Sequence, residues 1–93
     1  MLGKVVNQTG VRLFFTREKY IPSGEDYQFG RVCPESKVAT EVHLHREDGK
    51  GSLIIIDHRP DREIATYGDI SYTLGPEEDG EGRPVIHIHN RED

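Results

Sequence analysis

Four of the five histidines lie in two short segments in which apolar and polar residues alternate, Val42-His43-Leu44-His45 and Ile86-His87-Ile88-His89. Strict alternation is typical of a half-buried β-strand, and it places both imidazoles of a segment on one face, opposite the apolar side chains. Exposed imidazoles can bind a metal ion, stack against nucleobases or simply face solvent. The residue types alone leave these three interpretations open.

A metal site is one chemistry that this spacing permits. If the two segments pair as antiparallel neighbours, their imidazoles could hold a zinc, nickel or copper ion together, because cross-strand Cβ atoms are about 4.5–5.5 Å apart. The candidate ligands are His43, His45, His87 and His89. Neither pair is followed by a cysteine and solvent-facing histidines are the default, so we expect no resident metal or cofactor.

Short strands separated by turn residues follow one another along the whole chain. Extended segments are predicted at residues 4–6, 11–15, 27–32, 38–46, 52–58, 70–74 and 83–90, with loops at 20–26 and at the acidic, glycine-rich stretch 75–82. The apolar run within 52–58 predicts a central strand covered on both faces, and residues 63–67 fit either a short helix or a strand. Without a convincing amphipathic helix, the pattern indicates an all-β barrel or sandwich.

The composition is that of one small globular domain, residues 1–93. Hydrophobic residues make up 33% of the chain and charged residues 31%, and the apolar residues cluster in short runs, which argues against disorder. The longest apolar run is far shorter than the roughly 20 residues of a membrane helix, so no membrane association is expected. Cys33 is the single cysteine, which excludes an internal disulfide and fits a cytoplasmic location.

The net charge of −5 is unevenly distributed. Residues 1–46 carry seven Lys/Arg and five Asp/Glu, net +2, whereas residues 47–93 carry five and twelve, net −7. Phosphate contacts are made by Lys and Arg, so only the first half could present a mildly basic surface to a nucleic acid. The acidic half could instead present carboxylates to a basic protein partner.

Several segments follow one another in the order of a known family. They are Gly3-Lys4-Val5-Val6, Tyr27-Gln28-Phe29-Gly30-Arg31-Val32, Val42-His43-Leu44-His45, Gly68-Asp69-Ile70-Ser71-Tyr72-Thr73-Leu74-Gly75 and Arg83-Pro84-Val85-Ile86. Together they resemble the cold-shock domain, an oligonucleotide-binding (OB-fold) β-barrel, with its opening strand, two ribonucleoprotein motifs, glycine-rich loop and closing strand. The resemblance implies a small antiparallel β-barrel, to which residues 52–58 add an extra strand.

The same resemblance implies a module that binds single-stranded RNA or DNA by stacking bases on exposed rings. The implied stacking residues are Tyr27, Phe29, His43 and His45, with Arg31 and Lys4 as the phosphate-binding cations. The motifs are degenerate, since His43 takes the position of a stacking phenylalanine and Glu25-Asp26 replaces a Lys-Gly pair. Alternating aromatic residues also belong in cores, so Tyr27 and Phe29 could equally be core residues.

The main alternative is a small acidic protein that acts through protein–protein contact, as an adaptor, inhibitor or nucleic-acid mimic. Its docking carboxylates would come from the acidic stretch, notably Glu77, Glu78, Asp79 and Glu81. An enzyme is not expected, because the chain has neither a Ser/His/Asp signature nor a phosphate-cradling glycine loop. Single-stranded nucleic acid is therefore the favoured partner, followed by a protein on the acidic half and then by a metal ion.

Overall fold

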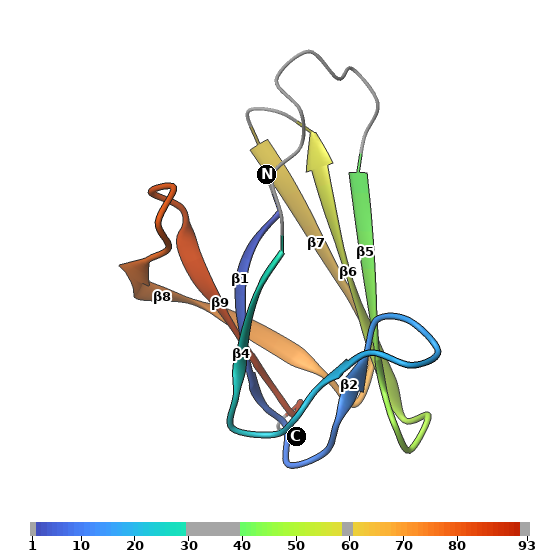
Figure 1. Ribbon diagram of the computed structural model, residues 1–93. Helices are drawn as coiled ribbons and strands as arrows, with labels where there is room; N and C mark the ends of the chain where they lie inside the picture. Colours follow the sequence, from blue (N-terminus) through green and yellow to red (C-terminus); the bar gives the residue numbers. More distant parts are fainter. Residues whose placement is uncertain (1, 30–39, 59–60, 92–93) are drawn as a thin grey trace.

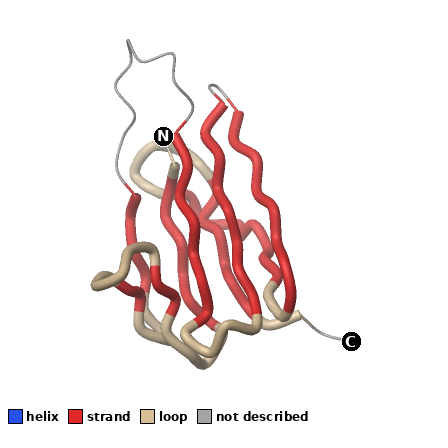
Figure 2. The backbone as a smooth tube through the Cα atoms, turned by 90° about the vertical axis from the view of Figure 1, so that its right-hand side faces the viewer, coloured by secondary structure: helices blue, strands red, loops and turns tan. Residues whose placement is uncertain are grey.

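A computed structural model describes residues 2–29, 40–58 and 61–91, which form nine β-strands and no helix. The strands are β1 (Gly3–Gln8), β2 (Leu13–Phe14), β3 (Tyr20–Ile21), β4 (Asp26–Phe29), β5 (Thr40–Arg46), β6 (Gly51–His58), β7 (Asp61–Gly68), β8 (Ser71–Glu78) and β9 (Pro84–His89). This part of the chain therefore holds no helix that could cross a membrane. The predicted all-β class is confirmed, and Figure 2 shows strands and loops but no helix among the described residues.

The nine strands are arranged in two sheets (Figure 1). Sheet A has the order β4-β1-β9-β8, and sheet B has the order β3-β2-β5-β6-β7. Neighbouring strands are antiparallel except β1 and β9, which run parallel. Residues 69–70 carry the chain from β7, at the edge of sheet B, to β8, at the edge of sheet A.

The described strands do not close into the barrel that the sequence predicts. Both sheets are open, with β4 and β8 at the edges of sheet A and β3 and β7 at the edges of sheet B. The parallel pairing of β1 with β9 is a second difference, because the predicted barrel is antiparallel throughout. Alternation along a strand defines which face is buried but not which strand lies beside it, so the pattern could not separate one barrel from two sheets.

The core is formed by side chains that alternate inward from both sheets. The fully buried members are Val5, Ile86 and Ile88 from sheet A, Leu13, Ile21, Leu44, Leu53 and Ile55 from sheet B, and Ile70 between the sheets. Burial of each such side chain contributes roughly 1.5–3 kcal/mol. The predicted central strand is confirmed as β6, which has a neighbour on both sides, but its outward residues Ile54 and Ile56 are only partly covered.

A buried amide ties the first strand of sheet A to the first strands of sheet B. The Nδ2 of Asn7 donates to the carbonyl oxygens of Val11 and Ile21, both at 2.8 Å. Its Oδ1 accepts from the backbone N–H and the hydroxyl of Thr9, at 3.0 and 2.7 Å. These four bonds satisfy the buried side chain completely and hold β1 against Ile21 of β3 and against the residues that precede β2.

Two segments that the sequence predicts as loops are strands in the structure. Tyr20 and Ile21 form β3 because they pair with Phe14 and Leu13 of β2. Residues 75–78 continue β8 past an irregularity in its pairing with β9. The segment 63–67, which fits a helix or a strand by sequence, is part of β7. In each case pairing with an adjacent strand outweighs the local composition.

Candidate functional site

The two histidine segments lie in different sheets. His43 and His45 project from β5 on the outer face of sheet B, the face turned away from the core, whereas His87 and His89 belong to β9 of sheet A. The structure therefore does not bring the four imidazoles together into the metal site that neighbouring strands would allow. Among the described residues, no group of three or more His, Cys, Asp or Glu side chains could hold a metal ion.

The histidines of sheet A are engaged locally. The Nε2 of His87 contacts the Oε1 of Glu77, and Gly75 leaves room for the ring, because a Cβ at that position would overlap it. The backbone N–H of Glu77 itself and the His87 ring hold the pKa of the Glu77 carboxyl below its ordinary value. The Nδ1 of His89 lies 3.0 Å from the carbonyl oxygen of Asn90.

Three of the residues that the cold-shock resemblance implies, Lys4, Tyr27 and Phe29, lie on sheet A. Phe29 is only 7% exposed and packs edge-on against Phe15, with ring centroids 5.2 Å apart, so it belongs to the core. Tyr27 contacts the same phenylalanine at 4.9 Å and is 39% exposed. Lys4 pairs with Asp26 at 3.4 Å on the other face of that sheet. Arg31 and Cys33 lie outside the described residues.

The acidic stretch 75–82, which begins within β8, is partly folded inward. Asp79 is buried, and its Oδ1 accepts from the backbone N–H groups of Glu81 and Arg83 at 2.9 and 3.1 Å. Burial raises the pKa of the Asp79 carboxyl, but these two N–H groups, together with the Gln28 side chain and the charge of Arg62, lower it by more, so the net shift is downward. Glu77 contacts His87, so the carboxylates of Asp79 and Glu77 are both engaged within the fold.

The outer face of sheet B carries a line of rings that the sequence analysis did not assemble. Cross-strand pairing aligns Tyr20 of β3, Phe14 of β2, His45 of β5, Ser52 of β6 and Tyr67 of β7. Directly paired residues point to the same face, so all five side chains lie side by side across the sheet. We call this line the aromatic row. Its tyrosines are well exposed, Tyr20 at 40% and Tyr67 at 56%.

One end of the aromatic row is organised by Arg12. Its Cζ lies 4.9 Å from the Tyr20 ring centroid and 5.4 Å from that of Phe14, and the two rings are 5.0 Å apart. Glu47 holds this arginine in place by accepting from its backbone N–H at 2.6 Å and its Nε at 3.2 Å. The backbone N–H and then the guanidinium of Arg12 hold the pKa of the Glu47 carboxyl below its ordinary value.

The rest of this face is apolar at its centre and acidic at its far end. Next to the aromatic row lie His43, Ile54 and Ala65, and beyond them Glu41, Ile56 and Glu63. The ring of His43 is 6.3 Å from that of His45, and its Nε2 lies 3.0 Å from the Oε2 of Glu41. The character of the face therefore changes along its strands. At one end lie the rings, with Arg12 and Lys50 beside them, and at the opposite end lie the carboxylates.

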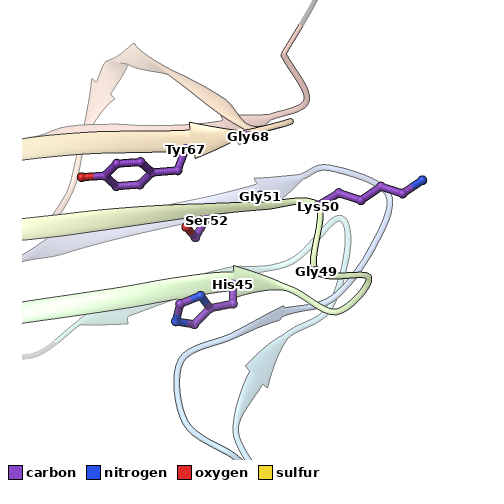
Figure 3. Close-up of a pocket in the computed structure, with 7 residues that line it drawn as sticks. All are labelled: His45, Gly49, Lys50, Gly51, Ser52, Tyr67 and Gly68. Carbon is purple, nitrogen blue, oxygen red and sulfur yellow. The ribbon is translucent and has the colours of Figure 1, made fainter.

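A hollow of about 250 Å³ opens in the aromatic row at the β5–β6 turn (Figure 3). It is lined by His45, Gly49, Lys50, Gly51, Ser52, Tyr67 and Gly68, and we call it the hairpin hollow. The side chains of His45, Ser52 and Tyr67 project from three adjacent strands on the same side of the sheet, while Lys50 extends away from them at the rim (Figure 3). Backbone alone forms part of the wall of the hollow, because three of its lining residues, Gly49, Gly51 and Gly68, are glycines.

Sequence reasoning found His43 and His45 on this face but missed Phe14, Tyr20 and Tyr67. The outward position of Phe14 follows from alternation with the buried Leu13, so the signal was present. Tyr67 lies in the segment that fits a helix or a strand, and Tyr20 lies in a segment interpreted as a loop. No pattern within the sequence shows that the three share a line, because the line exists only across paired strands.

Comparison with models of known protein families, with curated proteins and with solved structures gives no match to this chain. The chemistry of the site, and not a relative, therefore carries the functional argument. That chemistry is an exposed row of rings with an arginine stacked at one end and a hollow near the other.

Proposed function

We propose that this protein binds single-stranded nucleic acid on the outer face of sheet B, with bases stacked on the aromatic row. The observation that carries the proposal is the cross-strand alignment of Tyr20, Phe14, His45 and Tyr67 on one exposed face. Unpaired bases offer flat π-faces, and aromatic side chains and histidine are the groups on which proteins stack them. Each stacked base contributes roughly 1–3 kcal/mol, whatever its identity.

The charges around the row set the strength and the salt dependence of this binding. Arg12 stacks on two rings of the row and Lys50 stands at the rim of the hairpin hollow, so both can meet a phosphate backbone. The chain as a whole carries a net charge of −5, however. Few phosphates are therefore neutralised, and the expected affinity is modest and falls with added salt.

The cold-shock resemblance supports this proposal through the segment that corresponds to its second ribonucleoprotein motif. His43 and His45, which correspond to the second ribonucleoprotein motif, are exposed on the proposed face. Within the proposal, sheet B serves as an OB-type binding face, although the described strands form two open sheets. Phe29 takes no part, because it is buried in the core. The proposed contacts are thus made by the second motif and by rings from β2, β3 and β7.

The test compares two tyrosines of equal exposure on different sheets. Tyr20 is 40% exposed on sheet B and Tyr27 is 39% exposed on sheet A. Binding of a fluorescently labelled single-stranded 15-mer of uridine or thymidine is measured by anisotropy at low salt. Tyr20→Ala is expected to weaken binding by about five- to 150-fold, the equivalent of roughly 1–3 kcal/mol for one stacked base.

The matched control is Tyr27→Ala, which is expected to bind like the unchanged protein. Thermal melts of both variants establish that each is folded before its affinity is compared. Absence of any binding by the unchanged protein at low salt would overturn the proposal. So would an equal loss in the two variants, because sheet A would then contribute as much as the aromatic row.

A further inference from the structure

We propose that the hairpin hollow is a slot for a single nucleobase, held between the rings of His45 and Tyr67 above Ser52. This inference rests on the proposed function and adds where one base is seated and what holds it. The three side chains stand in line on adjacent strands, with the small serine between two rings (Figure 3). A small residue between two large planar ones leaves a gap that is open to solvent on its outer side.

The width of this gap suits one planar ring. Adjacent strands lie about 4.7–4.9 Å apart, so β5 and β7, which flank β6, are separated by roughly 9.5 Å. A ring inserted between two others needs about 3.5–4.0 Å on each of its faces. The separation between these strands therefore leaves room for one planar ring between His45 and Tyr67, and it is too narrow for two.

The volume of the hollow also suits a single base. It measures about 250 Å³, below the roughly 300–1,000 Å³ of pockets that enclose drug-sized ligands. A base fits while its sugar and phosphate remain outside. Lys50 lines the rim and its side chain points into solvent, where a phosphate of the same nucleotide would lie. Charge complementarity thus favours a nucleotide over a neutral aromatic ligand.

The floor of the slot is small and selects no particular base. Ser52, which lies between His45 and Tyr67 in the cross-strand pairing, has a short side chain, so a base of any identity fits above it. Gly51 and Gly68 close the end of the slot with backbone alone. A Cβ on Gly51 would come within 3.0 Å of the backbone nitrogen of Asp69, so these strands approach each other only because both residues are glycines.

Filling the slot without removing its rings is the direct test. Ser52→Leu places a branched side chain between His45 and Tyr67, whereas Ser52→Ala leaves the gap open. With the single-stranded 15-mer at low salt, we expect Ser52→Leu to lower the affinity by about tenfold or more, because one base loses both of its stacking partners. Ser52→Ala is the matched control and is expected to bind within about twofold of the unchanged protein.

A double-mutant cycle on His45→Ala and Tyr67→Ala gives an independent readout. If the two rings held different bases, their fold losses would multiply to within about twofold. If the two rings hold the same base, removing either ring opens the slot. The second substitution then causes a much smaller fold loss of affinity in the double variant than it causes by itself in the unchanged protein. Thermal melts of all variants separate a loss of binding from a loss of folding.

The outcomes distinguish the slot from the proposed function. Unchanged binding by a folded Ser52→Leu variant, or fold losses that simply multiply in the cycle, would overturn the slot and leave the stacking face standing. Absence of oligonucleotide binding by the unchanged protein would overturn the proposed function and the slot with it. A selective loss in Ser52→Leu together with coupled losses in the cycle supports the slot.

Discussion

At the scale of single residues, the buried guanidinium of Arg46 joins the two sheets beside the candidate site. Its Nε and Nη2 donate to the Asp48 carboxylate at 3.0 and 2.8 Å, and its Nη1 donates to the carbonyl oxygen of Asp69 at 3.0 Å and to the Oδ1 of Asn90. Arg46 ends β5 of sheet B, whereas Asn90 follows β9 of sheet A. A buried charge of this kind is tolerated only while its partners remain in place.

The pairing with Asp48 predicts how stability responds to acid. Hydrogen bonds from Arg46, and then from the backbone N–H of Lys50, hold the pKa of the Asp48 carboxyl well below its ordinary value. A carboxyl with a depressed folded-state pKa stabilises the fold above its unfolded pKa of about 3.9, and this contribution is lost as the pH falls toward the folded pKa. We therefore expect Asp48→Asn to lower the melting temperature at pH 5–7 and the difference from the unchanged protein to narrow below about pH 4.

Melting temperatures across pH 2–7, followed by circular dichroism, measure this effect. Asp26→Asn is the control, because that carboxylate makes only an exposed pair with Lys4, and such pairs contribute little. A difference between Asp48→Asn and the unchanged protein that stays constant down to pH 2 would contradict the prediction.

At the scale of elements, the close approach of β6 to β7 depends on Gly68. Its φ of +72° lies in the left-handed region, and an added Cβ would collide with the carbonyl oxygen of Lys50 and come within 3.0 Å of the Cα of Gly51. Gly24 has a similar φ of +85° but open space around it. We expect Gly24→Ala to cost about 1–2 kcal/mol through backbone strain, and Gly68→Ala to cost more, because backbone atoms must also move.

Urea unfolding of the two glycine variants separates strain from collision, because both replace a positive-φ glycine by the same residue. An equal loss of unfolding free energy in both variants would contradict the prediction, because it would show that the collision with backbone atoms at Gly68 costs nothing beyond the backbone strain. A larger loss at Gly68 is the expected result, and the Gly68→Ala substitution would also disturb the end of the hairpin hollow.

The sequence predicted strands where alternation and burial coincide. The segments at 42–45 and 86–89 alternate strictly, and both are strands with buried apolar residues. Strands whose own composition is typical of loops, and which form only because a neighbouring strand pairs with them, escaped prediction. Tyr20 and Ile21 precede Pro22 and Gly24, which are typical of loops, yet they pair with β2. The acidic, glycine-containing end of β8 is a strand for the same reason, because β9 lies beside it.

At the scale of the whole molecule, the order of strands decides which residues form a site. His43 and His87 occupy equivalent positions in similar sequence patterns, but β5 and β9 lie in different sheets. Likewise, Lys4, Tyr27 and His45 come from segments whose order resembles one family, but they lie on three different surfaces in the structure. Local patterns specify faces, whereas the candidate site depends on pairing between residues that are far apart in the chain.

The distribution of charge over the molecule leads to a last prediction. A protein with a net charge of −5 repels nucleic acid from most of its surface, so binding depends on the few cations beside the aromatic row. For single strands, the logarithm of affinity falls with the logarithm of salt concentration by about 0.7 for each phosphate that is neutralised. Lys50→Gln removes one such contact at the rim of the hairpin hollow, so we expect the slope to become shallower by about 0.7.

The control for this prediction is Lys4→Gln, which removes the same charge from sheet A, where Lys4 already pairs with Asp26. Anisotropy titrations of the single-stranded 15-mer at several salt concentrations give the slope for each variant. Because both variants have the same net charge, a uniform electrostatic effect would change the two slopes equally. A change confined to Lys50→Gln is expected, since only a lysine within reach of the bound phosphates releases a counterion when the strand binds.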